Sequence, residues 1–508
     1  MNHKKTAINF LASIISFGIT GLINFFLSPY LVSTVGESAY GFVSLATTFT
    51  SYAAIFSVAI NSMSGRFVMI AMERNDLKRA NTYYVSTLFA DLILGISFLI
   101  VGIWVVVNLE KLLVIPLEIK TDVKILFTLV FSGFILTTAC SVFDICYFVT
   151  NHLYVSSIRT ICTAGFKGLL VLILFLSFQP KLYYIGIGTF FVAVITVIFN
   201  RVASAKLLDF VRFDNKYFNI KAIRDIVSAG IWNSINSLGT ILSEGLDLII
   251  CNLFISPEMM GVMSLSKTVP MMLKSISSTI TGIFGPETVQ KYAAQDYIGM
   301  RNYIDFSNKC MRVVMCVPFG IFLGLGRYFY GLWVPEVDGD LLYVLGFLSI
   351  AATIFATSVS PVYNIFTAAN KLKIPSIVHI SGGAISTILV LILLRTTNLG
   401  VYAVAGVSSF VGIMKTFAVI LPFSAHLIHE KITYFFKESF LAAFTTVAVG
   451  LPGFLIMPLV KTQSWLIFIL CGIFYTLCAY SIVIPISLSR AERANIINML
   501  KKRGKRNV

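Results

Sequence analysis

The sequence predicts an all-α polytopic membrane protein with about 14 transmembrane helices, and three observations lead to this class. Of its 508 residues, 57% are hydrophobic and only 12% are charged, whereas a soluble domain has about 25% charged residues. Apolar stretches long enough to cross a bilayer as helices recur along the whole chain. The loops between them are too short for a soluble domain. Backbone groups find no water partners in lipid, so the spans must be regular helices.

Fourteen spans are expected, in this order along the chain: 8–32, 40–63, 82–107, 123–148, 154–178, 182–203, 224–254, 259–284, 304–331, 341–368, 374–394, 399–423, 438–459 and 464–487. The first stretch, "MNHKKTAINFLASIISFGIT", has a basic start but no convincing cleavage site, so we expect a retained span rather than a signal peptide. All eight cysteines fall inside the spans without metal-ligand spacing to histidine, and we expect neither a metal site nor disulfides.

The net charge of +16 is explained by topology rather than by nucleic-acid binding. If the N-terminus lies in the cytoplasm, the inner segments and the tail hold 26 lysines and arginines and the outer segments hold six. This excess predicts that both termini face the cytoplasm of a bacterial inner (plasma) membrane. Contact with anionic lipid headgroups then uses much of the positive charge.

Two short sequences repeat at a constant offset. "GESAYGFVSL" (36–45) resembles "SPEMMGVMSL" (256–265), and "LKRANTYY" (77–84) is echoed by "GMRNYIDF" (299–306), each about 220 residues later. Six spans separate the copies, so the copies keep the same orientation in the membrane. We therefore expect two parallel six-helix lobes around a central cavity.

The expected organisation follows from the repeat. Residues 1–203 form lobe one, 204–222 a cytoplasmic amphipathic linker, 223–423 lobe two, 424–487 two extra helices, and 488–508 a basic cytoplasmic tail. The linker reads either as an interfacial helix, with an apolar face against the membrane, or as a solvated segment.

The polar groups inside spans seven and eight are the main candidates for a site, because a charge at bilayer depth normally has a role. Span seven carries a stripe at three- and four-residue steps: Asn233, Asn236, Ser237, Thr240, Glu244 and Asp247. Span eight carries Lys267 and Lys274, two turns apart on one face. Helical rise places Asp247 and Lys267 at about the same depth, roughly 10 to 12 Å from the outer end.

Two interpretations of these charges stay open. A salt bridge between neighbouring helices, Glu244 or Asp247 with Lys267, is about as good as a functional role. It does not explain Lys274, or Lys167 in the middle of span five. In the functional interpretation, the lysines line a water-filled cavity and meet an anionic substrate, since the lysine ammonium is a compact charge suited to phosphate.

Chemistry inside the spans is otherwise sparse. Asp91 lies in span three, about two and a half turns from the inner side. We find no P-loop, no glycine-rich nucleotide motif, no ligand cluster and no nucleophile triad, so we expect a transporter rather than an enzyme, with no bound cofactor.

Three stretches resemble one family. "YLVSTVGESAYGFVSL" (30–45), "DLIICNLFISPEMMGVMSLSK" (247–267) and "LGVYAVAGVSS" (399–409) are similar to the corresponding junctions of Wzx-type polysaccharide flippases, in the multidrug/oligosaccharidyl-lipid/polysaccharide exporter superfamily. The sequence departs from the pattern at Met263, where many members have tyrosine, and at Ala403, where members often have glycine.

The resemblance implies a function and partners. It implies alternating access and export of undecaprenyl-pyrophosphate-linked oligosaccharide from the inner to the outer leaflet, for capsule, O-antigen or exopolysaccharide assembly. Lys167, Lys267 and Lys274 would then neutralise pyrophosphate or acidic sugars. Asn233, Asn236 and Thr240 would meet sugar hydroxyls. Coupling to H+ or Na+ would involve Asp91, Glu244 or Asp247, and a polymerase and glycosyltransferases are the expected protein partners.

Rival functions remain. A lipid II flippase is separated poorly by sequence alone. An ion-coupled multidrug exporter of the same superfamily usually takes cationic drugs and should favour unpaired carboxylates, whereas basic groups are at least as numerous here. A membrane glycosyltransferase or polymerase usually needs sizeable outer loops, which this chain lacks.

Overall fold

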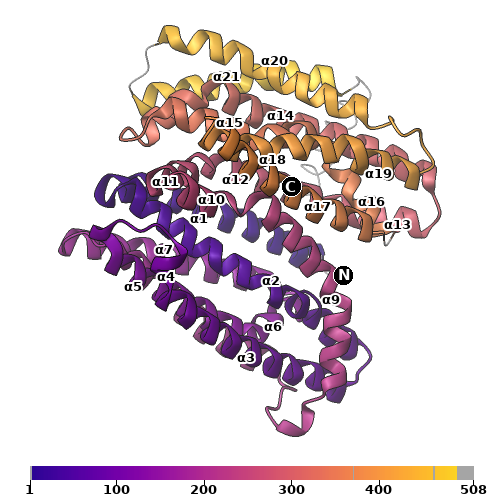
Figure 1. Cartoon of the computed structure of the whole chain (residues 1–508). Coiled ribbons are helices and arrows are strands. Elements are labelled where there is room, and N and C mark those ends of the chain that lie inside the picture. The colour runs from indigo at the N-terminus through magenta and orange to yellow at the C-terminus, as the bar shows by residue number, and fades with distance from the viewer. Residues whose placement is uncertain (1–2, 370, 461–463, 489–508) are drawn as a thin grey trace, which may run out of the picture. The chain divides into compact units, whose positions relative to one another are not determined.

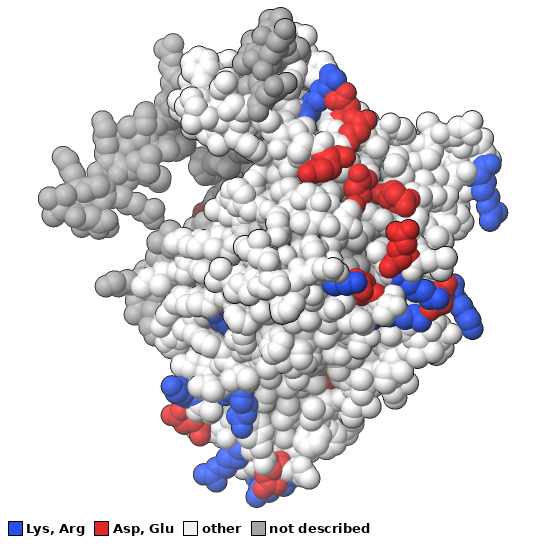
Figure 2. All heavy atoms as spheres, turned by 90° about the vertical axis from the view of Figure 1, so that its left-hand side faces the viewer, with Lys and Arg blue, Asp and Glu red and all other residues white. Residues whose placement is uncertain are grey.

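The computed structural model describes residues 3–369, 371–460 and 464–488, and every regular element in these ranges is helical (Figure 1). Thirteen of the described helices are long and apolar enough to cross a membrane. Large apolar side chains such as Phe26 and Phe56 are about two-thirds exposed. Figure 2 shows one face, on which uncharged side chains cover most of the surface and charged ones stand in small groups. The predicted all-α membrane class is confirmed.

The helices of the first half, in chain order, are α1 His3–Val35, α2 Glu37–Glu73, α3 Leu77–Val107, α4 Leu109–Leu112, η1 Leu117–Ile119, α5 Lys120–Ala139, η2 Ser141–Asp144, α6 Ile145–Val149, α7 Leu153–Ser177 and α8 Tyr183–Leu207. After η3 Asn215–Tyr217 come α9 Ile220–Glu244, α10 Asp247–Phe254, α11 Pro257–Ser266, α12 Thr268–Ile283, α13 Gly285–Ala293, α14 Tyr297–Trp333 and α15 Gly339–Ala356. The last are η4 Ser360–Val362, α16 Tyr363–Ala368, α17 Lys373–Thr396, α18 Val401–Lys415, the π-helical η5 Thr416–Ile420, α19 Leu421–Leu427, α20 Phe436–Val460 and α21 Trp465–Ser487.

Span eight accounts for the difference between fourteen expected and thirteen observed membrane-length helices. It is divided at Lys267 into α11 and α12, each too short by itself. Pro270 explains the division, because proline has no N–H to donate to the carbonyl four residues earlier. That carbonyl, on Ser266, accepts a hydrogen bond from the Tyr330 hydroxyl instead, at 2.6 Å. The break is therefore satisfied inside the protein, as a membrane interior requires.

By its contacts the chain forms two compact units. Unit 1 contains residues 1–265 with 379–387, and unit 2 contains 266–378 with 388–508. The helices α9, α10 and α11 thus belong with the first six spans by packing, although the repeat assigns them to lobe two. Gly230 shows why α9 stays there, since a side chain at this position would overlap the carbonyl oxygen of Ala59 on α2. The lobe boundary at 222/223 concerns the sequence repeat and stays a prediction.

The linker after α8 is not the helix that its amphipathic pattern allows. Only the short η3 is helical between α8 and α9. Asn81 of α3 holds the linker through both backbone groups of Arg212, each at 3.0 Å. The amide of Asn219 donates to Ser86 Oγ at 2.9 Å. Side-chain hydrogen bonds from α3 thus replace helical ones, and the segment packs on unit 1 rather than standing in solvent.

The two lobes contain the same turn before their third spans. Asn75 and Gln295, 220 residues apart, both have φ of 56°. The next residues, Asp76 and Asp296, each cap the following helix by accepting a hydrogen bond from the backbone N–H three residues on. Such a positive φ is uncommon outside glycine. Its recurrence at the predicted offset supports the repeat.

The glycines of the two sequence echoes touch each other. A side chain at Gly41 would lie 2.8 Å from Met260 Cε and 2.9 Å from the nitrogen of Gly261, and one at Gly261 would overlap the carbonyl oxygen of Glu37. Ser44 and Ser264, also 220 residues apart, share a hydrogen bond. Equivalent residues meeting in pairs are the sign of a two-fold relation. The contact requires glycine, which explains why the echo keeps it.

Candidate functional site

Span seven is discontinuous at the point where its charged residues begin. The helix α9 ends at Glu244 and α10 begins at Asp247. The carbonyl of Gly245 accepts a hydrogen bond from the Tyr52 hydroxyl of α2. Interrupted helices with exposed backbone groups are frequent where transporters bind substrates or ions.

The predicted stripe on α9 is divided between two environments. Asn233 donates to Ser62 Oγ of α2 at 3.0 Å, so its amide is already engaged. Asn236 and Thr240 are exposed, and the Thr240 hydroxyl donates to the Asn236 carbonyl one turn earlier at 3.2 Å. Asn236 and Thr240 therefore present polar groups on an open face of α9.

The charged candidates around the breaks do not form one group that the structure defines. Asp247 is buried in the first turn of α10, in unit 1. Lys267 lies at the break between α11 and α12, and half-buried Lys274 lies on α12, both in unit 2. The side chain of Glu244 lies outside the described residues. Pairing of Asp247 with Lys267, and of Lys167 with Lys274, stays a prediction.

Lys167 is half-buried midway along α7. A side chain on Gly188 of α8 would meet Lys167 Cγ at 3.3 Å, so the lysine stem runs along this glycine. The adjacent Gly168 packs against Ile23 of α1. Within the described ranges, Lys167 Nζ has no hydrogen-bond or ion-pair partner. An unpaired ammonium at this depth is costly, which makes Lys167 the strongest anion-binding candidate in unit 1.

Asp91 lies in a fully buried polar cluster on α3. Ser141 Oγ of η2 lies 2.6 Å from Asp91 Oδ2 and 2.9 Å from Asn61 Oδ1 of α2. Asp91 is 0% exposed, and its second oxygen, Oδ1, is buried without a hydrogen-bond partner in the described structure. Sequence reasoning singled out Asp91 but missed Asn61 and Ser141, because only the break after α5 turns Ser141 toward α3.

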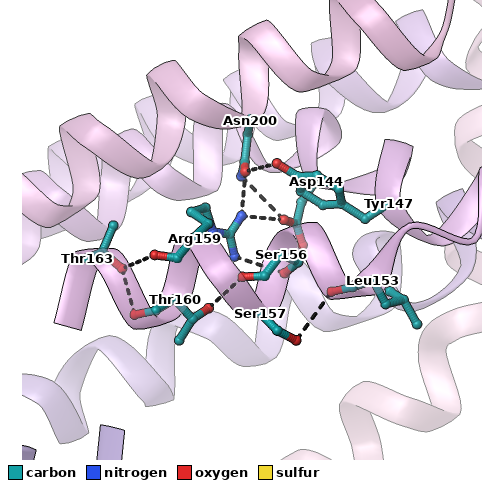
Figure 3. A network of polar contacts seen from close by, with 9 residues as sticks. All are labelled: Asp144, Tyr147, Leu153, Ser156, Ser157, Arg159, Thr160, Thr163 and Asn200. Carbon is teal, nitrogen blue, oxygen red and sulfur yellow. Dashed lines mark hydrogen bonds and ion pairs between the residues drawn. The ribbon is translucent and has the colours of Figure 1, made fainter. Parts of the chain in front are cut away.

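A second polar cluster lies next to the first, at the other end of η2 (Figure 3). Arg159 of α7 donates to Asp144 Oδ1 at 2.7 Å, to Asn200 Oδ1 of α8, and to Ser156 Oγ at 3.3 Å. Tyr147 of α6 also donates to Asn200 Oδ1, at 2.9 Å. Arg159 is 14% exposed, so this ion pair is better shielded than a surface one. The cluster fastens η2 and α6 to α7 and α8.

In unit 2 the best-buried charge fastens the two extra helices. Arg312 of α14 is 3% exposed, and its Nη1 lies 2.7 Å from each carboxylate oxygen of Glu438 on α20. Its other nitrogens donate to Ser487 Oγ and to the Ser487 carbonyl of α21. Small residues let the helices approach closely, since a side chain on Gly324 would meet the Gly450 carbonyl at 2.7 Å. This arrangement is structural and keeps α20 and α21 on α14.

The remaining charged groups and cysteines do not define a catalytic or metal centre. In the part of the chain that the structure describes, no three His, Cys, Asp or Glu residues are placed to hold a metal ion, and all eight cysteines are free thiols. Outside the spans, Lys120 and Lys124 donate to Glu110 and hold its pKa below the usual value. Burial raises the pKa of Tyr434, which donates to Asp305, to about 12.

Known proteins share this architecture. The chain is similar to an inward-facing structure of a multidrug resistance MATE family transporter of the MOP superfamily, with a TM-score of 0.67 and 14% identity over 82% of this chain and 98% of that one. An outward-facing structure of such a transporter gives a TM-score of 0.59, also at 14% identity, over 84% of this chain and 96% of that one. These likenesses show the fold.

Sequence relatives show the family. The "Uncharacterized membrane protein EpsK" of Bacillus subtilis (strain 168) is 25% identical over 503 residues, which is 98% of each chain. The model of the family described as "Polysaccharide biosynthesis protein" matches residues 6–284, more than half of the chain. The resemblance noted in the sequence is confirmed at this level: the chain belongs to the polysaccharide biosynthesis protein family.

Proposed function

We propose that this protein is a flippase that moves a pyrophosphate-linked oligosaccharide on a polyprenyl lipid from the inner to the outer leaflet by alternating access. Membership of a polysaccharide biosynthesis family and the fold of MOP-superfamily transporters support it. In this proposal the membrane is the bacterial inner membrane, both termini are cytoplasmic, and a polymerase and glycosyltransferases act beside the protein.

Lys167 is the observation that carries the proposal. Its ammonium has no counter-charge in the described structure, although removing a charge from water without a partner is strongly unfavourable. A diphosphate provides the missing negative charge, and the open polar face of Asn236 and Thr240 offers hydrogen-bond partners to sugar hydroxyls. Lys267 and Lys274 would add positive charge along the path.

The test replaces Lys167 by Gln, which keeps length and polarity without the charge. Export should fall about tenfold or more, because a hydrogen bond to a charged group contributes about 1.5 kcal/mol or more. Lys167→Arg should keep part of the activity. Export is measured in spheroplasts as the fraction of radiolabelled lipid-linked oligosaccharide that a membrane-impermeant oxidant of sugar diols reaches from outside.

Lys181→Gln is the matched control, since Lys181 is exposed in the loop before α8 and should tolerate the change. Undiminished export by a Lys167→Gln, Lys274→Gln double variant at normal protein level would exclude the cationic path. Export of lipid II instead of the oligosaccharide, in the same assay with labelled lipid II, would reassign the substrate.

A further inference from the structure

The Asp91 cluster has a hydrogen-counting problem. Ser141 Oγ lies within hydrogen-bond distance of two oxygens, Asp91 Oδ2 and Asn61 Oδ1, but a hydroxyl has one proton to donate. If Asp91 is protonated, its carboxyl O–H donates to Ser141 Oγ and Ser141 donates to Asn61 Oδ1. Every short contact then has its proton. The neutral carboxyl also suits Asp91 Oδ1, which is buried without a donor, a position that penalises a charged group.

Lobe two contains the same frame without the carboxyl. Thr87 and Ser307, 220 residues apart, both donate to the carbonyl of a tyrosine one turn earlier, so α3 and α14 are in register. At this offset Asp91 corresponds to Met311, which is 0% exposed. The counterparts of Asn61 and Ser141 are Thr281 and Ser360, and their hydroxyls lie 2.6 Å apart.

The fold therefore does not need an acid at this place. Both lobes interrupt the helix at a serine, with η2 in lobe one and η4 in lobe two, and both join that serine to the preceding bundle helix. Lobe two does so with a buried methionine where lobe one has Asp91. A titratable group has been placed in lobe one in a frame that is stable without it.

The charged surroundings of Asp91 do not supply a counter-ion. No charged side chain among the described residues acts on its carboxyl, and its titratable neighbours are the Cys140 thiol at the end of α5 and the Tyr84 phenol on α3. Asp144 of η2 is paired with Arg159 of α7. Asp225 of α9 faces Arg79 at the start of α3.

From this geometry we infer that Asp91, with Ser141 and Asn61, is a proton-binding site that controls the η2 break. When the proton leaves to water, Asp91 Oδ2 and Asn61 Oδ1 compete for the single Ser141 proton, and η2 loses one of its two tethers to α2 and α3. The segment Ser141–Asp144 also carries the Asp144 end of the Arg159 clamp. Release of the proton thus loosens η2 and α6 from the bundle, and this does not depend on which substrate the protein carries.

The proton is tested by infrared spectroscopy on the full-length protein in lipid nanodiscs. Wild type should show the carbonyl band of a protonated carboxyl at neutral pH, and Asp91→Asn should lack it. Asp91→Met, which copies lobe two, is the second variant should the first fail to fold. A spectrum in which neither variant removes such a band would show that Asp91 is ionised, with the Asn61 amide turned to donate to Ser141, and would overturn the inference.

The coupling is tested by hydrogen exchange of residues 141–149. Above the pH at which the band disappears, wild-type exchange should rise about tenfold per pH unit beyond the intrinsic effect, as release of one proton requires. Asp91→Asn should remove this extra dependence, and Ser141→Ala should make exchange fast at every pH. Ser360→Ala in lobe two should leave residues 141–149 unchanged. Equal pH dependence in wild type and Asp91→Asn, or restored protection by Na+ at fixed high pH, would refute proton control.

Discussion

The helix breaks η2 in lobe one and η4 in lobe two are built on the same plan and carry different chemistry. In both, a serine after the break reaches a polar side chain on the second helix of its lobe, Asn61 in one and Thr281 in the other. Beside this contact, lobe one buries Asp91 and lobe two buries Met311. Thr281 has a further acceptor, the Ser277 carbonyl at 2.8 Å, whereas Asp91 Oδ1 has no donor.

The difference separates what the frame needs from what has been added to it. Lobe two satisfies its polar groups and fills the core with an apolar side chain, as packing alone favours. Lobe one leaves a buried acid incompletely satisfied. Buried polar groups that a fold does not require are more often retained for function than for stability.

Exchanging the two residues should give the largest effect. Met311→Asp places a carboxyl in an apolar, fully buried position of lobe two, and we expect it to destabilise the protein by ~3 kcal/mol or more. Asp91→Met should be far milder, since lobe two accommodates methionine in the same frame. Thermal unfolding of the purified protein in detergent measures both.

The sharpest contrary result would be the reverse order. A destabilised Asp91→Met protein beside a stable Met311→Asp protein would mean that the acid is a structural part of lobe one. Met311→Leu serves as the control, because it changes shape without adding a polar group.

The equivalent turns at Asn75 and Gln295 should respond unequally to glycine. Both residues have φ of 56°, a conformation that asparagine tolerates better than glutamine. Gln295→Gly should therefore stabilise the protein by up to about 1 kcal/mol, and Asn75→Gly should be nearly neutral. The comparison uses denaturation midpoints of the two variants. Equal gains at both positions would show that the turns are not strained in the way their φ angles indicate.

The smallest effect is expected at the exposed Glu110 cluster of lobe one. Because Lys120 and Lys124 lower the pKa of Glu110, the cluster stabilises the folded protein above the ordinary glutamate value of 4.5 and loses this contribution as the pH falls through the lowered pKa. The melting temperatures of wild type and Glu110→Gln should differ slightly at pH 7 and converge in acid. Added salt should reduce the difference, and Glu118→Gln, at an exposed glutamate nearby, should show neither behaviour.

Much of the site could be anticipated only as single residues. Asp91, Lys167 and the stripe from Asn233 to Asp247 stand out because polar groups in apolar spans are rare. Their partners do not stand out, since Asn61, Ser141 and Asn200 are ordinary residues in sequence. Pro270 and Gly245 signal the breaks in spans eight and seven, but a span predicted from hydropathy alone runs through both.

The sequence by itself determined the membrane class, the approximate spans, the orientation preference and the repeat at 220 residues, because each depends on composition, apolar length or periodicity along the chain. Only the tertiary structure decided that the linker packs on α3 without becoming a helix, that Gly41 meets Gly261, and that Ser141 joins Asp91 to Asn61. These contacts join residues 50 to 220 positions apart. Their energy comes from close packing and from satisfying buried polar groups in three dimensions, which no local pattern records.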